Sequence, residues 1–405
     1  MKRNGEQENL LLQKFVFTAG IILLYLLGRK LPLFGIDLSF YRQTAVDAEK
    51  LLLLSIAGDY AKCSVFALGI SPQITAGILI SALFAMKSRE KKEKSSEVRK
   101  KRRTVELTLL FALWQAFFSV RSLHFLPEMS IRYPVRLLAF LEMVSGSLLL
   151  LWMSDRNKRF GIGGQSVMIL INILDGIMRT LQGADRNDYA MPLIISALAV
   201  VVVIFADRTE KRIGLQRIGI RSEYADKNYL AVKLNPTGVT PVMFASAIFA
   251  LPQLLLFALG YFFPETESIS AISAQLTLSK PIGVAVYLFC IYLLAFISSM
   301  MYLNPKDYTD RMLKSGDSLE NLHPGRETKK YLTRVVYTYS FIGATLLAGC
   351  VAVPLVLQFY GRVNTTLMML PVSFMLFTGI WQNVSEEIRA VQKMASYRSL
   401  QNLMK

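Results

Sequence analysis

The sequence has few of the residues from which metal sites and disulfide frameworks are built. Its 405 residues include two histidines and three cysteines. The cysteines, Cys63, Cys290 and Cys350, lie in separate apolar segments and follow no metal-binding or disulfide spacing. Two histidines cannot form a metal site by themselves. We therefore expect no metal ion, no cofactor and no catalytic centre in this chain.

Acidic residues are also scarce. The chain has 29 Asp and Glu residues against 46 Lys and Arg residues, which gives a net charge of +17 at pH 7. Such an excess could indicate binding to nucleic acid, but the basic residues do not alternate with aromatic ones as they do in a nucleic-acid groove. We therefore expect no nucleic-acid partner, and the basic excess has another cause.

Apolar residues, in contrast, are abundant. They make up 53% of the chain, and its mean hydropathy is +0.39, which is too high for an ordinary soluble domain. A helix that crosses a bilayer needs ~20 mostly apolar residues. Runs of about this length cover residues 15–34, 64–86, 105–126, 134–153, 164–182, 190–206, 238–262, 281–303, 333–356 and 364–384. We predict an all-α polytopic membrane protein with ten transmembrane helices and no separate soluble domain.

The placement of charge indicates how these helices are oriented. With the N-terminus in the cytosol, the internal segments are 1–14, 87–106, 154–160, 207–235, 304–334 and 385–405. They hold 34 of the 46 basic residues and 18 of the 29 acidic residues, so the rest of the chain is nearly neutral. This asymmetry follows the positive-inside rule. It predicts a multi-pass protein of the cell membrane with both termini in the cytoplasm.

Two internal loops, 207–235 and 304–334, are longer than orientation requires, and each carries seven basic residues. Loops of this length tend to carry function. We expect them to bind a cytosolic partner with an acidic surface.

A duplicated motif gives the internal organisation. Residues 69–77 and 238–246 both read glycine, β-branched apolar residue, hydroxyl residue and proline, and each opens a membrane-length apolar run. Corresponding glycine- and proline-broken helices indicate two related halves around a central pathway. The N-terminal half would cover residues 1–182, the C-terminal half 190–405, and an external hinge 183–189. Five spans in each half would make the halves inverted in the membrane.

Three smaller features complete the pattern. Residues 51–60 are apolar but too short to span, so they form either a half-helix that fills a channel or an amphipathic helix on the outer surface. Asp175 and Arg179 are one turn apart and can neutralise each other. The glycines of residues 161–164 lack the Gly-Lys-Ser/Thr ending of a phosphate loop, and we interpret them as a flexible start of a helix.

Several segments resemble, in order, the motifs of the SecY family of protein-translocation channels. Residues 66–76 (FALGISPQITA) resemble its second-helix motif, and residues 235–246 (NPTGVTPVMFAS) its seventh-helix motif. Residues 161–163 resemble the start of its fifth helix. Residues 304–307 (NPKD) and 323–332 (HPGRETKKYL) resemble the large loop between helices eight and nine. The resemblance runs from about residue 10 to residue 395.

The resemblance implies a clamshell with a lateral gate, an apolar pore ring and an external plug at about residues 48–63. The gate residues are Ser71, Pro72, Ser81, Thr240, Pro241 and Ser246. The ring residues are Ile70, Ile74, Leu170, Leu174 and Met243. A one-residue gap in the fifth-helix match would place Ile169 and Ile173 in the ring instead of Leu170 and Leu174. The plug residues are Ser55, Ile56, Ala57, Gly58 and Asp59. The tenth helix departs from the family pattern and gives no ring residue.

Departures from the family pattern point to one branch of it. The large loop has His323 where the family usually has arginine, and Ser81 stands where many relatives have glutamine in the gate. Together with the short chain, these features resemble the accessory SecY of Gram-positive bacteria, which exports serine-rich glycosylated adhesins.

The resemblance also implies partners. They are a SecA-type motor ATPase, small SecE-like and SecG-like membrane subunits or accessory Sec proteins, an unfolded secretory client and the lipid bilayer. The motor would dock on Arg212, Arg217, His323, Arg326 and Lys329. The alternatives are a general SecY channel, a secondary transporter for a small solute, an insertase scaffold and an intramembrane enzyme, which would need a His, Asp or Glu cluster.

Overall fold

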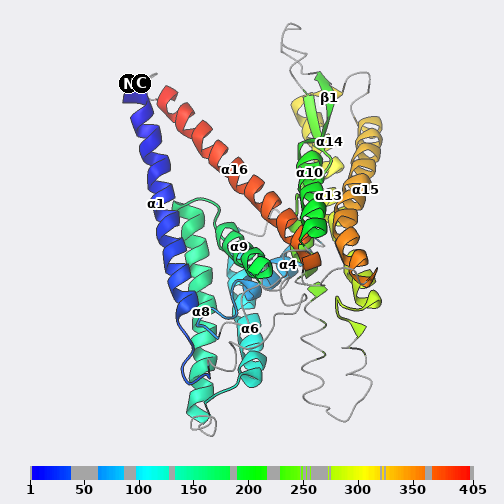
Figure 1. Cartoon of the computed structure of the whole chain (residues 1–405). Coiled ribbons are helices and arrows are strands. Elements are labelled where there is room, and N and C mark those ends of the chain that lie inside the picture. Colours follow the sequence, from blue (N-terminus) through cyan, green and yellow to red (C-terminus); the bar gives the residue numbers. More distant parts are fainter. Residues whose placement is uncertain are drawn as a thin grey trace.

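The computed structural model describes residues 2–37, 63–85, 97–126, 133–182, 189–216, 229–246, 275–319, 325–360 and 367–401, with single positions at 248, 249, 252, 256, 272 and 322. Long helices dominate it, and the two chain ends lie at the same end of the molecule (Figure 1). The small sheet that contains β1 lies at that end too. We call it the sheet end.

The first half of the chain supplies five described helices. They are α1 (Lys2–Lys30), α4 (Ser71–Ala85), α6 (Glu97–Ser122), α8 (Tyr133–Phe160) and α9 (Ser166–Gln182). The second half supplies α10 (Ala190–Arg208), α13 (Pro281–Tyr302), α14 (Pro305–Ser315), α15 (Arg326–Leu357) and α16 (Leu370–Gln401), with short 3-10 turns η3 (Gln358–Tyr360) and η4 (Leu367–Met369). Residues 240–246 are also helical.

Six stretches within the described residues are long and apolar enough to cross a bilayer. They are Leu11–Lys30, Pro134–Phe160, Ala190–Arg208, Pro281–Ser315, Arg326–Leu357 and Leu367–Met394. Two other spans expected from hydropathy fall on α4 and α9, which have 15 and 17 residues. At ~1.5 Å per residue, both helices are shorter than the ~30 Å apolar layer. Their buried positions (eight in α9) place them inside the bundle, where a full crossing length is not needed.

The long internal loops are more ordered than their charge suggests. β1 (Glu210–Gln216) pairs antiparallel with β2 (Tyr229–Lys233) and with β3 (Ser318–Leu319), so both loops contribute to one three-stranded sheet. Apolar side chains of the strands, such as Ile213, Val232 and Leu319, pack with Leu332 and Val335 of α15. The sheet therefore sits directly on the end of a membrane helix.

The glycine-rich segment before α9 is held rigidly, and our interpretation of it as flexible is wrong. Asn157 is fully buried and donates hydrogen bonds to the carbonyls of Ile162 and Gly164, both at 2.9 Å. Thr18 of α1 accepts a hydrogen bond from the Ile162 amide at 2.9 Å. A side chain at Gly161 would meet Asn157 Oδ1 at 2.0 Å. Glycine is needed here for close packing.

Helix α16 joins the two halves. It packs against α10 of its own half and against α9 of the other half, and it crosses the middle of the molecule obliquely (Figure 1). Glu387 accepts a hydrogen bond from the Gly163 amide at 3.0 Å. Glu386, the residue before Glu387, pairs with Lys233 of β2 at 3.5 Å. Two consecutive carboxylates thus contact opposite halves.

Candidate functional site

The duplicated motifs adopt the same local structure. Gly69 and Gly238 both have left-handed backbones, with φ of 54° and 59°, a conformation that favours glycine. In each motif, helix begins two residues later, at Ser71 and Thr240. The sequence similarity therefore corresponds to a repeated structural element, a left-handed glycine turn that starts a helix.

The starts of both motif helices enter one central apolar cluster. Ile70 and Ile74 belong to it from the first motif, and Val239, Val242 and Met243 from the second. The cluster also takes side chains from α9 and from the η4–α16 segment. These are Ile169, Leu170, Ile173, Ile177, Met369, Leu370, Val372, Met375 and Leu376. We call these residues, with the five motif residues, the waist; it is built by both halves of the chain.

Four of the five expected ring residues lie in the waist. Ile70, Ile74, Leu170 and Met243 are at most 8% exposed, whereas Leu174 is 46% exposed and is not part of the cluster. Its neighbour Ile173 is fully buried there, and so is Ile169 at 1%. Burial thus separates Ile173 from Leu174, whereas Ile169 and Leu170 both lie in the cluster, and the register of the ring stays a prediction.

The waist also takes side chains from η4 and α16, the part of the chain in which the sequence gave no ring residue. Met369 and Met375 are each 1% exposed and lie in the waist. Methionine is flexible and fills irregular space, so both suit a cluster that has to adapt its shape. The nearly continuous apolar run of this segment carried no family motif, and for this reason the sequence did not single out any of its residues.

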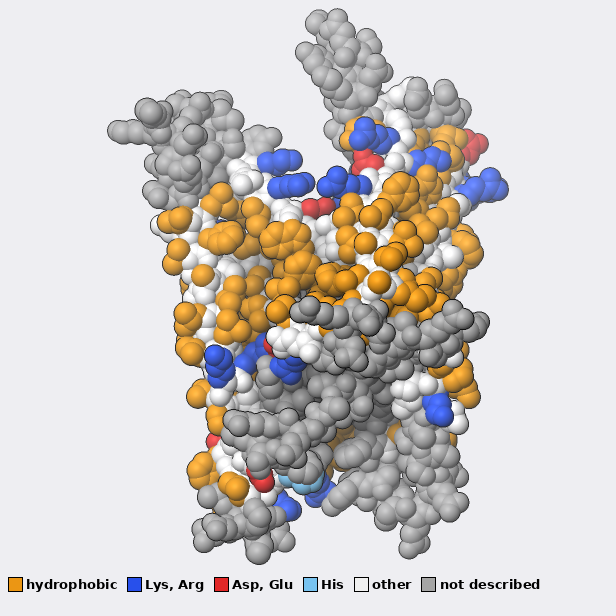
Figure 2. Space-filling view, viewed as in Figure 1, with side chains coloured by type: hydrophobic (Ala, Val, Ile, Leu, Met, Phe, Trp, Pro, Cys, Tyr) orange, Lys and Arg blue, Asp and Glu red, His pale blue; other side chains and the backbone are white. Residues whose placement is uncertain are grey.

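A polar cavity of about 960 Å³ adjoins the waist on the side of the sheet end. It extends from Lys233 of β2 to Thr240 and Pro241, at the start of the second motif helix. Other polar groups of its wall come from α10, α13 and α16: Asp207, Arg208, Ser298, Gln382, Glu386 and Arg389. Figure 2 shows the molecule hollowed at this end, with Lys, Arg and acidic side chains around the hollow and an apolar band below it. All of the lining residues come from the C-terminal half, and none of them belongs to the waist.

The expected gate residues lie on the two motif helices. Ser71 is half-buried and Pro72 is buried, and Ser81 lies on α4. Thr240 and Pro241 line the polar cavity. Ser246 is buried and hydrogen-bonded to the Tyr287 hydroxyl of α13 at 2.7 Å. This bond ties the second motif helix to α13.

Several expected residues fall outside the described part of the chain: the plug residues 55–59, Arg217 and His323. The other three docking residues are Arg212 on β1 and Arg326 and Lys329 on α15, all at the sheet end. Arg212 donates to Glu210 at 2.9 Å, and this hydrogen bond raises the pKa of the guanidinium. Arg212 therefore keeps its charge at neutral pH.

An ionic cluster ties α1 to α9. The predicted pair of Asp175 and Arg179 is confirmed at 2.8 Å. Arg29 of α1 contacts the same Asp175 oxygen at 2.6 Å, and its side chain is 9% exposed. The Tyr25 hydroxyl donates to Asn172 Oδ1 next to this pair. The sequence indicated the Asp175–Arg179 pair by its spacing, but gave no signal for Arg29, which lies 146 residues away.

Comparison with known proteins identifies the family. The family model described as SecY matches residues 64–379, which is most of the chain. This chain belongs to the SecY family. The match includes both motifs, the waist and the sheet, so the geometry described above is that of a SecY-family protein.

Sequence relatives of this SecY-family chain cover almost its whole length. The "Accessory Sec system protein translocase subunit SecY2" of Streptococcus pneumoniae serotype 4 is 27% identical, over 96% of this chain and 97% of its own. The protein of the same description from Streptococcus gordonii is 26% identical, over 96% and 98%. That from Leuconostoc gelidum is 26% identical, over 98% and 99%.

Solved structures show the same fold for this SecY-family chain. One described as "The structure of a protein conducting channel" has a TM-score of 0.66 and 18% identity, over 95% of this chain and 93% of that chain. Sec61 in the canine ribosome-channel complex has a TM-score of 0.61 and 17% identity, over 95% and 93%. The predicted fold class, a helical polytopic clamshell of the SecY type, is confirmed, and six stretches of the described residues are long and apolar enough to cross a membrane.

Proposed function

We infer that this chain is the channel subunit of an accessory Sec protein translocase, which passes unfolded polypeptide across the cell membrane. One observation carries the inference: the two halves together build one apolar waist, at the start of both motif helices. The relatives that match the whole chain are accessory Sec translocase subunits, and this supports the same role.

The chemistry of the waist suits this role. A constriction of apolar side chains excludes water and ions when it is empty. It also presents no fixed hydrogen-bond donors or acceptors that would hold a passing segment. The flexible Met243, Met369 and Met375 can move aside for clients of different shape. The halves would separate along the gate between the two motif helices, and the plug residues would seal the resting channel.

Photocrosslinking tests the function and the position of the waist together. We propose a photoreactive amino acid at Ile74 or Met243, with a secretory client stalled during export. Both positions should label the client, because both lie in the waist. The control position is Leu174, which is exposed and outside the cluster. Labelling at Leu174 and not at Ile74 or Met243 would contradict the proposed path, and uptake of a small solute without client labelling would favour a transporter.

We propose that the energy for export comes from a partner. The chain would be no enzyme, and a SecA-type ATPase would dock at the sheet end, where two basic loops form one sheet. Small SecE-like and SecG-like subunits or accessory Sec proteins would complete the complex. The client would be a serine-rich glycosylated adhesin. Both termini would be cytoplasmic, in agreement with the basic excess of the internal segments.

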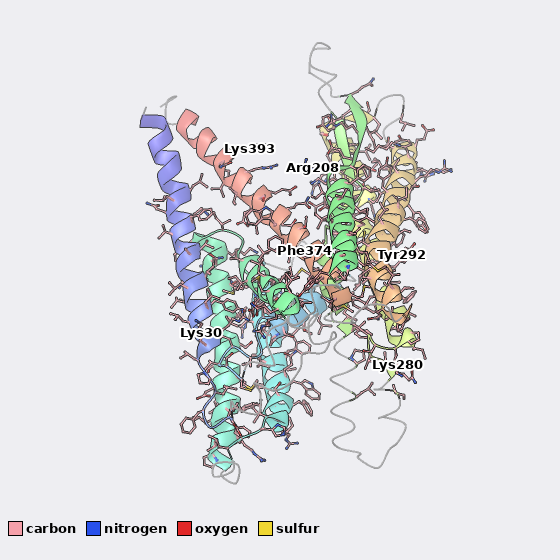
Figure 3. All side chains as sticks on the ribbon, viewed as in Figure 1. Lys30, Arg208, Lys280, Tyr292, Phe374 and Lys393 are labelled. Carbon is pink, nitrogen blue, oxygen red and sulfur yellow. The ribbon has the colours of Figure 1, made fainter. Side chains whose placement is uncertain are left out.

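Charge reversal tests the docking proposal. Arg326→Glu should lower client export and motor ATPase stimulation several-fold, because electrostatic complementarity sets association with an acidic partner. The control is Lys280→Glu. Lys280 is an exposed cation at the start of α13, far from the sheet end (Figure 3). Both variants should reach the membrane in wild-type amounts. Equal export by wild type and Arg326→Glu would contradict docking at this residue.

A further inference from the structure

The small sheet at the sheet end has an open edge. Its strand order is β2-β1-β3, so β1 is the central strand and β2 is an edge strand. On one side β2 pairs with β1, and no other strand of the described residues pairs with it on its outer side. The backbone N–H and C=O groups along the outer side of an edge strand are a template on which a further strand can pair.

The register of β1 and β2 shows which backbone groups lie on this outer edge. The Leu234 amide donates a hydrogen bond to the carbonyl of Thr209 at 2.9 Å, and the register places these two residues directly opposite each other. Hydrogen-bonded pairs alternate with non-bonded pairs along an antiparallel ladder. Every second residue of β2 therefore directs its N–H and C=O away from β1. These residues are Tyr229, Ala231 and Lys233.

The packing of side chains agrees with this assignment. Val232 is buried and Leu230 is partly buried in the apolar cluster on α15, so one face of β2 is covered. On the opposite face, Tyr229 is 43% exposed, and the Arg212 guanidinium of β1 lies 4.7 Å from the centre of its ring. Ala231 is partly exposed. The outer edge of β2 thus adjoins an exposed face of the sheet.

The position of β2 indicates which partner would use the edge. β2 ends at Lys233, which lines the polar cavity, and the same cavity is lined by the expected gate residues Thr240 and Pro241. A chain paired along β2 would therefore be directed toward the gate. Among the proposed partners, only the client has to travel from the sheet end to the gate. The client is also unfolded, so its backbone N–H and C=O groups are available for pairing, whereas those of a folded motor are already paired.

We propose that the outer edge of β2 binds the unfolded client as an additional β-strand on its way to the gate. This inference rests on the proposed function of the chain. Backbone groups make the contact, so it is independent of the client's sequence. Three outward-directed residues supply few hydrogen bonds, so the contact is weak. Because the pattern of a strand repeats every two residues, the client can advance by two residues and form the same bonds again.

Disulfide formation with a stalled client tests the added strand. Tyr229→Cys would be introduced into the chain with its three native cysteines replaced by alanine, and a single cysteine would be moved one residue at a time through the client. Opposite residues of a hydrogen-bonded pair have Cα atoms ~5.5 Å apart, within the range of about 4.4–6.8 Å that a disulfide spans. Since side chains alternate between the two faces of a strand, we expect several-fold more disulfide at every second client position.

A proline on the edge tests the role of the backbone. Ala231→Pro removes one outward-directed N–H and none that pairs with β1, and proline is tolerated in an edge strand at such a position. The alternating pattern should disappear, and client export should slow several-fold. The matched control is Ala231→Val, which keeps the N–H and favours a strand, so it should keep both the pattern and the rate. Both variants should reach the membrane in wild-type amounts.

Each other outcome would overturn the inference. Disulfides at consecutive client positions would show proximity without strand pairing. Equal patterns in Ala231→Pro and Ala231→Val would show that the edge N–H is not used, and a disulfide to the motor in place of the client would make the edge a motor-docking site. Client labelling at Ile74 and Met243 without any disulfide at Tyr229→Cys would exclude the added strand but leave the proposed function intact. Absence of both signals would contradict the function itself.

Discussion

Ile173→Asn should make the resting channel leak ions, whereas Leu174→Asn should not. The two residues are adjacent on α9, but Ile173 is fully buried in the waist and Leu174 is 46% exposed outside it. The Asn side chain would have no hydrogen-bond partner in this apolar site. Hydration of its amide would therefore stabilise the water-filled state of the channel by about 1–3 kcal/mol. This raises the share of water-filled channels by about tenfold, and water carries ions with it.

Potassium efflux from membrane vesicles that contain the complete translocase measures the leak. The amount of each variant would be matched by immunoblot, and client export would show that both variants are folded. The pair also tests the register of the fifth helix. Efflux through Leu174→Asn but not through Ile173→Asn would support the ungapped alignment and contradict the register that burial favours.

The largest loss of stability should come from Asp175→Asn. This change removes the carboxylate that Arg29 and Arg179 both contact, at 2.6 and 2.8 Å. Since the Arg29 side chain is 9% exposed, its charge is left in a poorly hydrated site. Removal of one member of a buried ion pair costs 3–5 kcal/mol. Asp175 is partly exposed, so we expect a loss near the lower end, about 3 kcal/mol of unfolding free energy.

Denaturant unfolding of the purified chain in detergent measures this loss. Arg179→Met serves as the control, because Arg179 is more exposed and a pair of this kind contributes ~1 kcal/mol or less. The double variant Arg29→Met/Asp175→Met should recover much of the stability, since it removes the more buried arginine together with the carboxylate, and only the more exposed Arg179 loses this contact. Equal losses for Asp175→Asn and Arg179→Met would show that Arg29 does not depend on this carboxylate.

The overall architecture was predictable because its signals are periodic and local. Membrane-length apolar runs, the one-sided basic excess and the repeated motif each follow from a short stretch of sequence. Gly69 and Gly238 illustrate this best, since the same residue types produced the same left-handed turn in both halves. The Asp175–Arg179 pair was also local, one helical turn apart.

Other features depend on contacts that hydropathy does not encode. Leu170, Ile173 and Leu174 are all apolar, so the sequence did not distinguish the side of α9 that enters the waist from the exposed side. The strands of the basic loops were missed because their apolar positions are few, and they become buried only against Leu332 and Val335 of α15. The turn before α9 was misread because its rigidity comes from Asn157 and from Thr18 on another helix.

The position of α16 has a consequence for how the channel can widen. Helix α16 contacts both halves of the chain, so it cannot keep both sets of contacts when the halves separate. Its contact with α10 lies within one half, so α16 should travel with that half and slide along α9. The hydrogen bond from the Gly163 amide to Glu387 joins the segment before α9 to α16, and so joins the two halves. We therefore expect opening to move α16 along α9, and this movement would break the Gly163–Glu387 hydrogen bond.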